Sequence, residues 1–424
     1  MADTAEAPLL AKIRAHQVIA RAEERPGNGR WSRFAQPRWI GILGIGLGLL
    51  AFWLALPPLA SRTLVWPILV GVLSVAAGIA ATTRGAGRVG WGAIVAGLAG
   101  IALGALATHS STSHLNDVIV WSALIASTLR YATPLTYAAI GGMFSERSGV
   151  VNIGLEGDML MGSFFGVWGA DVTNSWFLGL LIAILSGMVL ALVHAFFCIQ
   201  LRADQIVVGT AINFLALGVT GYLFVDKYGA NGAPTSIPTI PDITINSLKG
   251  VYFIGPVFGD LNLMIWLSFV LLFVSYIVMF RTPIGLRIRS VGEHPRAADT
   301  VGISVYATRY AAVVVSGGLA AMGGAYLSLG FVHTFDQNIT GGRGFIALAA
   351  LIFGKWRPLG AFAACLLFGF SSALGDRLPT YFTAGSSLPV LFNALPYVLT
   401  LIAVAGVIGR SIPPAAIGRP YVKQ

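Results

Sequence analysis

Long apolar runs separated by short polar turns dominate the chain from residue 39 to residue 409. A helix of about 20 apolar residues crosses a bilayer core, and most of these runs are close to that length. We therefore predict an all-α, polytopic membrane protein with about eleven transmembrane helices, or twelve if one short run is counted. The predicted spans are Trp39–Leu56, Val65–Thr82, Gly90–Ala107, Val118–Met143, Val151–Ala170, Phe177–Gln200, Ile206–Phe224, Leu263–Phe280, Tyr310–Gly330, the short Gly344–Gly354, Pro358–Leu374 and Pro389–Gly409.

Two places interrupt this pattern. The run Gly344–Gly354 would be only about 16 Å long as a helix, which is too short to cross a bilayer alone. The stretch Met143–Gly157 carries Glu146, Arg147 and Glu156 where a span should be apolar. Irregular backbone at membrane depth is stable only when it is buried in protein or lines a cavity, and paired short segments of this kind mark transport pathways. We predict broken or re-entrant segments at both places.

Composition supports this interpretation. The 424 residues are 56% hydrophobic and 10% charged, whereas about a quarter of a soluble domain is charged. The net charge of +10 gathers at the ends of the apolar runs, a pattern that orients membrane proteins and does not point to nucleic acid. The positive-inside rule places both termini in the cytoplasm. Cys198 and Cys365 lie in distant apolar runs and indicate neither a disulfide nor a metal site.

The polarity pattern divides the chain into four parts. Residues 1–38 form a basic tail that lacks the apolar core and cleavage site of a signal peptide, and we expect this tail in the cytoplasm. Residues 39–116 hold three spans rich in Gly and Ala that look like an addition. The core is expected from 117 to 409, with a cytoplasmic loop at 281–309, and residues 410–424 form a cytoplasmic C-terminal tail.

Glu156 is the most unusual charge in the predicted core. It lies between Gly154 and Gly157 in an apolar run, where an ionised carboxylate is costly unless it is paired or faces water. One interpretation is a structural ion pair with Arg130 or Arg147 that fixes a broken helix. The other is a carboxylate that faces the substrate or gates the pathway.

Other polar and aromatic side chains fall near the two interruptions. Asn152 and Asn213 are suited to hydrogen-bonding a polar solute, or equally to tying helices together. Aromatic faces there would stack on a nucleobase, although packing between helices is the alternative. The candidate residues of a substrate pathway are Asn152, Glu156, Phe164, Phe165, Asn213 and Phe345.

The sequence contains no motif of an enzyme that supplies energy. The pair Gly354–Lys355 is followed by Trp356 and has Ala349 where a phosphate-binding loop needs its first glycine. The tract Ser316–Gly318 lies inside an apolar span, where small residues favour helix packing. HExxH, paired CxxC and GxSxG motifs are absent from the sequence. We therefore predict a non-catalytic chain that holds no metal or cofactor.

The loop Arg281–Arg309 is the polar stretch best suited to a partner. Pro283 and Pro295 favour turns or helix starts, and a short helical run after Pro295 would end at Gly302. The spacing Arg-Ala-Ala-x-x-x-Gly resembles the Glu-Ala-Ala-x-x-x-Gly loop of ABC importer permeases, with arginine in place of glutamate. A merely solvated basic loop is the alternative. The resemblance implies that the ATPase couples to Gly292, Glu293, His294, Pro295, Arg296, Ala297, Ala298 and Gly302.

From Arg130 to the C-terminus the chain resembles permease subunits of nucleoside-type ABC importers, which belong to a larger group with simple-sugar and branched-chain amino-acid permeases. The similarity is carried by the blocks LRYATPLTYAAIGGMFSERSGVVNIGLEG, IGLRIRSVGEHPRAADTVGISVYATRYAAVVVSGGLAAMGGAYL, GGRGFIALAALIFGKWRPLGA and IGRPYVK.

This resemblance implies the ABC importer permease fold, nucleoside transport and a bacterial plasma (inner) membrane location, with sugars or branched-chain amino acids as alternative substrates. It also implies three partners: a second permease subunit in a heterodimer, an ATPase that binds ATP and Mg²⁺, and a substrate-binding lipoprotein. An ion-coupled secondary transporter, suggested by Glu156 and Asp158, is the alternative from another class. If Ala298 faces the ATPase, the substitution Ala298→Glu should block docking.

Overall fold

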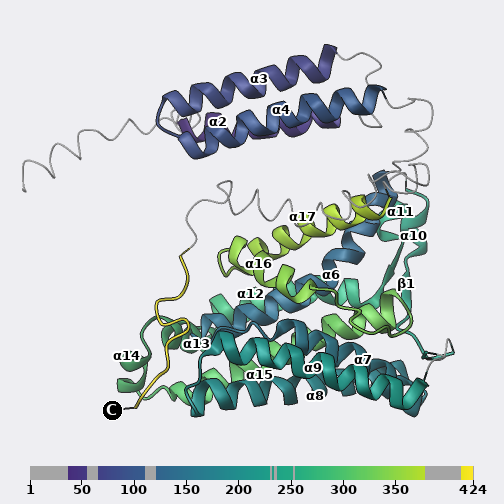
Figure 1. Ribbon diagram of the computed structural model, residues 1–424, viewed down its shortest axis with the longest axis vertical. Coiled ribbons are helices and arrows are strands. Elements are labelled where there is room, and N and C mark those ends of the chain that lie inside the picture. The colour runs from purple at the N-terminus through teal and green to yellow at the C-terminus, as the bar shows by residue number, and fades with distance from the viewer. Residues whose placement is uncertain are drawn as a thin grey trace, which may run out of the picture. The chain divides into compact units, whose positions relative to one another are not determined.

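A computed structural model describes residues 37–54, 65–109, 121–229, 232–233, 236–251, 254–377 and 412–423. The described chain is mainly helical, as the hydropathy pattern predicts, and it divides into two compact units (Figure 1). Unit 1 comprises residues 1–117 and unit 2 comprises residues 118–424.

The described part of unit 1 contains three packed helices, α2 (Pro37–Trp53), α3 (Val65–Thr83) and α4 (Gly87–His109). Small residues bring their backbones together: a Cβ atom added to Gly48 would lie 2.5 Å from the carbonyl carbon of Ala96. The Ser74 hydroxyl donates to the Gly44 carbonyl at 2.6 Å and to the Ala93 carbonyl at 2.9 Å. Close glycine contacts and a serine bridge are typical of helices that associate in lipid.

Unit 2 is built around α7, α8 and α15, which pack against one another and lie side by side in Figure 1. Two of these helices continue into π-helical turns. The helical elements of unit 2 are α6 (Trp121–Arg147), α7 (Leu155–Thr173), α8 (Trp176–Ala195), η1 (Phe196–Gln200), α9 (Gln205–Tyr228), α10 (Asn246–Lys249), α11 (Ile254–Phe258), α12 (Leu263–Arg281), α13 (Pro283–Glu293), α14 (Pro295–Thr300), α15 (Val305–Ala325), η3 (Tyr326–Phe331), α16 (Arg343–Phe353) and α17 (Pro358–Arg377).

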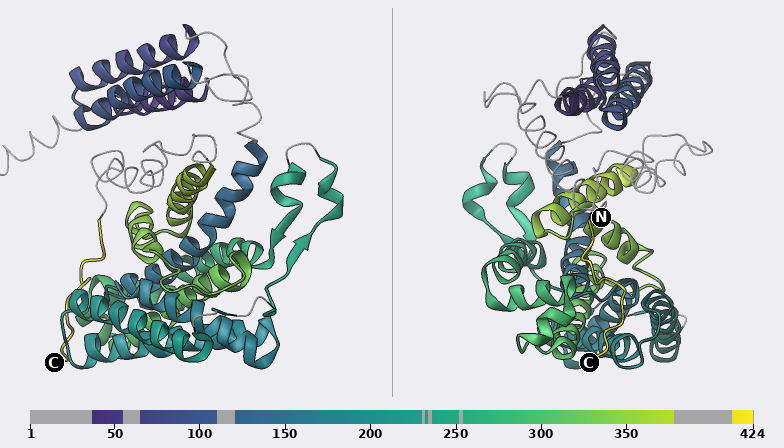
Figure 2. Two further views of the ribbon diagram at one scale, coloured as in Figure 1. Left: turned by 45° about the vertical axis from the view of Figure 1, so that its right-hand side comes forward. Right: turned by 90° about the vertical axis from the view of Figure 1, so that its left-hand side faces the viewer.

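The connection between α9 and α12 departs from the all-α prediction. Two strands, β1 (Asp242–Thr244) and β2 (Asp260–Asn262), pair antiparallel with Asp242 opposite Asn262. The segment forms an arm that Figure 2 shows beside the helices of unit 2. Asn262 anchors it, because its side-chain amide donates to the Ile240 carbonyl at 2.9 Å and its side-chain oxygen caps α12. Three-residue strands leave no hydropathy pattern long enough to recognise.

Six helices in the described residues are long and apolar enough to cross a membrane: α3, α8 with η1, α9, α12, α15 with η3, and α17. Shorter apolar helices cover Pro37–Ala51, Gly87–Ala102 and Arg343–Phe353. The predicted span Pro389–Gly409 lies outside the described residues. The structure thus supports a multi-pass helical protein with six candidate spans in the described residues.

The loop predicted at 281–309 is more ordered than the sequence suggested. Thr282 caps α13, accepting from the Gly285 N–H, and Pro283 occupies the first turn, where its missing N–H costs nothing. The helix α15 begins at Val305, five residues before the predicted span. This extension includes Arg309. Because the protein buries this arginine, its charge does not meet lipid, and the helix can continue past it.

Candidate functional site

The backbone leaves helical geometry between α6 and α7, as predicted. After α6 the chain turns at Gly149, whose φ of 93° is accessible mainly to glycine, and runs irregularly to Gly154. The Ser145 hydroxyl donates to the Val150 carbonyl at 2.8 Å, and the Val151 N–H donates to Gln205 Oε1 at 2.7 Å. Side chains therefore satisfy backbone groups that the interrupted helix leaves free.

Glu156 joins the start of α7 to the start of α16. Its Oε1 accepts from the Gly342 N–H at 2.8 Å, and its Oε2 accepts from the Gly344 N–H at 2.6 Å. The side chain is 7% exposed. A carboxylate at a helix N-terminus is stabilised by the unpaired N–H groups and by the positive end of the helix dipole. This arrangement explains how a buried acid is held here.

One of the two interpretations of Glu156, an ion pair with Arg130 or Arg147, was wrong about the partner. The two carboxylate oxygens bind backbone N–H groups instead. The Arg147 guanidinium instead donates to the Trp356 carbonyl through Nε at 3.1 Å and Nη2 at 2.9 Å. Every residue type except proline has a backbone N–H group, so the sequence does not show which of them pairs with an acid. Only the glycines of Gly341-Gly342-Arg343-Gly344 indicated that this backbone could approach another segment closely.

The other end of α16 is also tied to α6. The indole N–H of Trp356 donates to Glu146 Oε2 at 2.5 Å, and both side chains are buried. Together with Glu156, this contact holds the short helix at both ends. The polar residues that interrupted the hydropathy pattern near 146 and 156 thus fix the half-helix α16.

The two predicted asparagines bind protein groups. Asn213 of α9 accepts from the Gly157 N–H at 2.8 Å and donates to the Ile153 carbonyl at 3.0 Å, so it bridges both sides of the interruption. Asn152 donates to Ser316 Oγ at 3.0 Å and to Asp158 Oδ2 at 3.5 Å. Its Oδ1 is buried and has no hydrogen-bond partner among the described residues. The helix-tying alternative therefore describes Asn213 in this structure.

The predicted aromatic residues differ in exposure. Phe164 is 2% exposed and packs edge to face against Phe165 and Phe335. Phe165 is partly buried beside Trp168. Phe345, in the first turn of α16, is 49% exposed. In this conformation Phe345 has a free face, whereas Phe164 belongs to the core.

The predicted coupling residues lie around α13 and α14, the elements beside the chain terminus in Figure 1. Gly302, with φ of 84°, follows α14. The exposed members are Glu293, His294, Arg296, Ala297 and Gly302; Pro295 is partly buried, and Gly292 and Ala298 are buried.

Ala298 does not face outward as the docking prediction required. It is 3% exposed and packs against Val291, Val305 and Tyr421 of its own chain. The neighbouring Ala297 is exposed. On a six-residue helix, adjacent residues point in different directions, so one alanine faces the protein and the other is available to a partner. The sequence spacing alone did not show which alanine is which.

The C-terminal segment 412–423 completes this region. It forms one wall of a groove of about 530 Å³. The opposite wall consists of Glu293, His294, Pro295, Arg296 and Ala297. The pKa of the Tyr421 phenol on this segment is raised, because the phenol is partly desolvated and the Asp299 carboxylate lies beside it.

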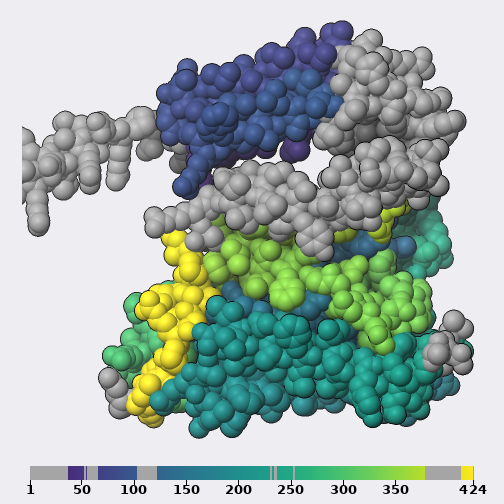
Figure 3. Space-filling model, viewed as in Figure 1, coloured from purple at the N-terminus to yellow at the C-terminus, as the bar shows by residue number. Residues whose placement is uncertain are grey.

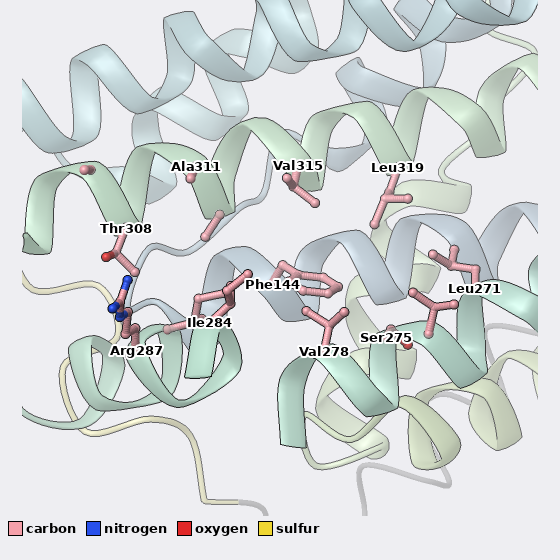
Figure 4. Close-up of a pocket in the computed structure, with 14 residues that line it drawn as sticks. Phe144, Leu271, Ser275, Val278, Ile284, Arg287, Thr308, Ala311, Val315 and Leu319 are labelled. Carbon is pink, nitrogen blue, oxygen red and sulfur yellow. The ribbon is translucent and has the colours of Figure 1, made fainter. Parts of the chain in front are cut away.

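A second pocket, of about 530 Å³, lies between α6, α12, α13 and α15. Figure 4 shows Phe144, Val278 and Val315 pointing into it, with Arg287 and Thr308 at one end. Its walls are otherwise almost entirely apolar, and none of the predicted pathway residues lines it. Such walls suit an apolar group better than a polar solute.

The chain belongs to the family described as the branched-chain amino acid transport system / permease component, whose model matches residues 124–404. The match begins after unit 1. No solved structure matches the chain.

Several relatives are named as ABC transporter permeases. The guanosine ABC transporter permease protein NupQ of Bacillus subtilis is 42% identical over 73% of this chain and 99% of its own length. The nucleoside ABC transporter permease protein NupC of Lactococcus lactis is 38% identical over 73% of this chain and 100% of its own length. The putative glucose ABC transporter permease protein TsgC13 of Haloferax volcanii is 37% identical over 60% of this chain and 77% of its own length.

These comparisons confirm the predicted class. The chain is a multi-pass permease subunit of an ABC transporter. It is non-catalytic, and ATP is hydrolysed by a partner ATPase. The family match thus supports the sequence resemblance and contradicts the alternative of an ion-coupled secondary transporter.

Proposed function

We propose that this chain is a permease subunit of an ATP-driven nucleoside importer in a bacterial plasma (inner) membrane. The supporting observation is its 42% identity with a guanosine ABC transporter permease along 99% of that protein. It would form half of the translocation pathway beside a second, different permease subunit. A substrate-binding lipoprotein would deliver the nucleoside on the outer side.

In this proposal the ATPase docks on the exposed side of α14. Arg296 and Ala297 project from this helix, and the groove beside them is bordered by charged and small residues. Both termini and the α13–α14 region would lie in the cytoplasm, following the distribution of Lys and Arg in the sequence. ATP and Mg²⁺ would bind only to the ATPase.

We further propose that the solute passes near the facing starts of α7 and α16. Irregular backbone at membrane depth is found where it is buried or lines a cavity, and both helix starts are irregular here. Glu156 would act as a strut that holds α16, a structural role in which backbone N–H groups replace the predicted arginine partner. Phe345, half exposed on the first turn of α16, is the aromatic residue best placed to meet a passing base.

The substrate class is tested on the assembled transporter. The binding protein is titrated with guanosine, adenosine, uridine, ribose, glucose and leucine, and uptake of the bound compounds is measured in proteoliposomes that contain ATP. We expect binding and uptake of nucleosides only. Selective uptake of glucose would favour the sugar alternative suggested by the Haloferax relative, and uptake without the ATPase would contradict the proposal altogether.

The docking site is tested with Ala297→Glu. A carboxylate on the exposed side of α14 should reduce co-purification of the ATPase at least about ten-fold if it becomes buried and unpaired on docking. The control is Ala86→Glu, the same change on the α3–α4 turn of unit 1. Equal recovery of the ATPase with both variants would rule out α14 as the docking helix.

A further inference from the structure

The C-terminal segment is bound to two parts of unit 2 through its backbone. The Ala416 N–H donates to the Gly292 carbonyl at 2.9 Å, at the end of α13. The Gly418 N–H donates to the Gly149 carbonyl at 3.1 Å, in the turn that follows α6. Figure 3 shows the segment in yellow along the edge of unit 2. The segment therefore connects the α13–α14 region with the turn that leads to α7.

Arg309 lies buried beneath this connection. Its side chain is 1% exposed, its Nε donates to the Ser148 carbonyl at 3.2 Å, and its Nη1 donates to the Arg419 carbonyl at 3.1 Å. A Cβ atom at Gly149 would lie 2.9 Å from Nη2, so the turn packs directly on the guanidinium. A buried cation is costly unless it is hydrogen-bonded. Here the two accepting carbonyls belong to the turn and to the C-terminal segment, and Nη2 has no hydrogen-bond partner among the described residues.

Tyr421 closes the segment over α15. The Tyr306 hydroxyl donates to the Tyr421 carbonyl at 3.3 Å, and the two rings are 5.6 Å apart. The Tyr421 side chain is 6% exposed and packs against Val291, Ala298 and Val305. One segment thus covers the buried sides of both α13 and α14.

The turn at Ser148 and Gly149, which contacts Arg309, continues into the irregular stretch before α7. A Cβ atom at Gly292 would lie 2.0 Å from the Arg147 carbonyl oxygen, which leaves no gap between α13 and this turn. A few residues further on, Glu156 binds the start of α16. Packing contacts and hydrogen bonds therefore run from α14 to α16 through the irregular stretch between α6 and α7.

We propose that Arg309 and residues 412–423 form a clamp that transmits displacement of α14 to the start of α7. Arg309 is a positioning residue here, and the C-terminal segment moves with α13 and α14 as one body. The clamp rests on the proposed docking of the ATPase at α14. The clamp adds a defined connection between α14, which the ATPase would displace, and the irregular stretch before α7, which would change the pathway.

The test uses the complete transporter in proteoliposomes with the variants Arg309→Met, Arg309→Lys and Tyr421→Ala. Arg281→Met, a change of an exposed arginine at the end of α12, is the control. Three quantities are measured: co-purified ATPase, ATP hydrolysis, and solute transported per ATP hydrolysed. We expect Arg309→Met to leave the first two within about two-fold and to lower the third about ten-fold. Arg309→Lys, which keeps the charge, should recover part of the loss.

Two other outcomes contradict the clamp. Unchanged transport per ATP in Arg309→Met means that the contact transmits nothing. Loss of the ATPase from Arg309→Met means that Arg309 sets docking instead of transmission. If Arg309→Met fails to assemble, Tyr421→Ala decides by the same three quantities. Failure of the proposed ATPase docking on α14 can be told apart from failure of the clamp. If the docking proposal fails, Ala297→Glu retains the ATPase, whatever Arg309→Met does.

Discussion

Unit 1 and unit 2 both pack helices through glycine, but among the described residues only those of unit 2 add polar contacts at interrupted backbone. In unit 1, Gly48 lies against Ala96, and Ser74 bridges two carbonyls. In unit 2, Gly162 lies against Ala321 in the same way, yet Glu156 and Asn213 also bind free N–H groups. Continuous helices satisfy their own backbone, so polar side chains are required only where a helix stops.

The largest effect should come from Gly344→Val. A Cβ atom at this position would lie 2.5 Å from both the Cα and the N of Glu156, and backbone cannot move aside easily. We expect a loss of about 3 kcal/mol or more in the stability of the folded state, with transport abolished. Thermal unfolding of the purified protein in detergent measures the change.

The matched control for that substitution is Gly46→Val in unit 1, where an added Cβ meets nothing within 4 Å. We expect its stability to change by less than about 0.5 kcal/mol. Similar losses of stability in Gly344→Val and Gly46→Val would show that glycine matters only for backbone conformation. The close contact at Gly344 would then not distinguish unit 2 from unit 1.

Glu156→Gln should have the next largest effect. One side-chain oxygen keeps its N–H partner, but the new amide N–H₂ group faces an N–H group, so one charge-assisted hydrogen bond is lost. The expected cost is about 2 kcal/mol, with a fall in transport. Thermal unfolding and uptake are measured on the same preparation, with Glu156→Asp as the shorter charged control. Full stability together with full transport would show that the carboxylate neither supports α16 nor gates the pathway.

Asn213→Ala should cost about 1.5 kcal/mol, because the Gly157 N–H and the Ile153 carbonyl lose their partner together. Asn213→Asp separates the two bonds, since it keeps the acceptor for Gly157 and removes the donor to Ile153. Unfolding temperatures should fall in the order wild type, Asp, Ala. A reduced affinity for substrate at unchanged stability would instead place Asn213 in contact with the solute.

The smallest effect is expected from Ser74→Ala in unit 1. Interhelical hydrogen bonds in membranes contribute about 0.6 kcal/mol on average, because alternative partners exist in the unfolded state. Unfolding should shift slightly and transport should not change. A transport defect from this change would give unit 1 a role beyond the family core, which begins at residue 124.

Hydropathy predicted most helices within a few residues, because a run of apolar residues long enough for the bilayer has few alternatives. For α13 only a turn or helix start was predicted, at Pro283, where the helix does begin. The helix itself was not predicted, since its basic and apolar residues alternate as they also do in a solvated loop. The arm with β1 and β2 was missed because its strands are three residues long.

The candidate site was predicted as a region, while its contacts were not. Glu156 was recognised by its cost in an apolar run, but its partners are backbone N–H groups that no residue type reveals. The orientation of Ala297 and Ala298 depends on Tyr421, more than 120 residues further along the chain by the numbering. Contacts of that kind depend on the tertiary fold and leave no trace in local spacing.

The carboxylate of Glu156 also has a consequence for selectivity by charge. The free N–H groups at the start of a helix would ordinarily attract a phosphate, but at α16 two of them are already bound to this acid. If the solute passes these helix starts as proposed, a phosphate group would meet the Glu156 carboxylate instead of free donors, whereas an uncharged nucleoside would meet no such repulsion. The same contact that holds the half-helix in place would therefore discriminate against nucleotides.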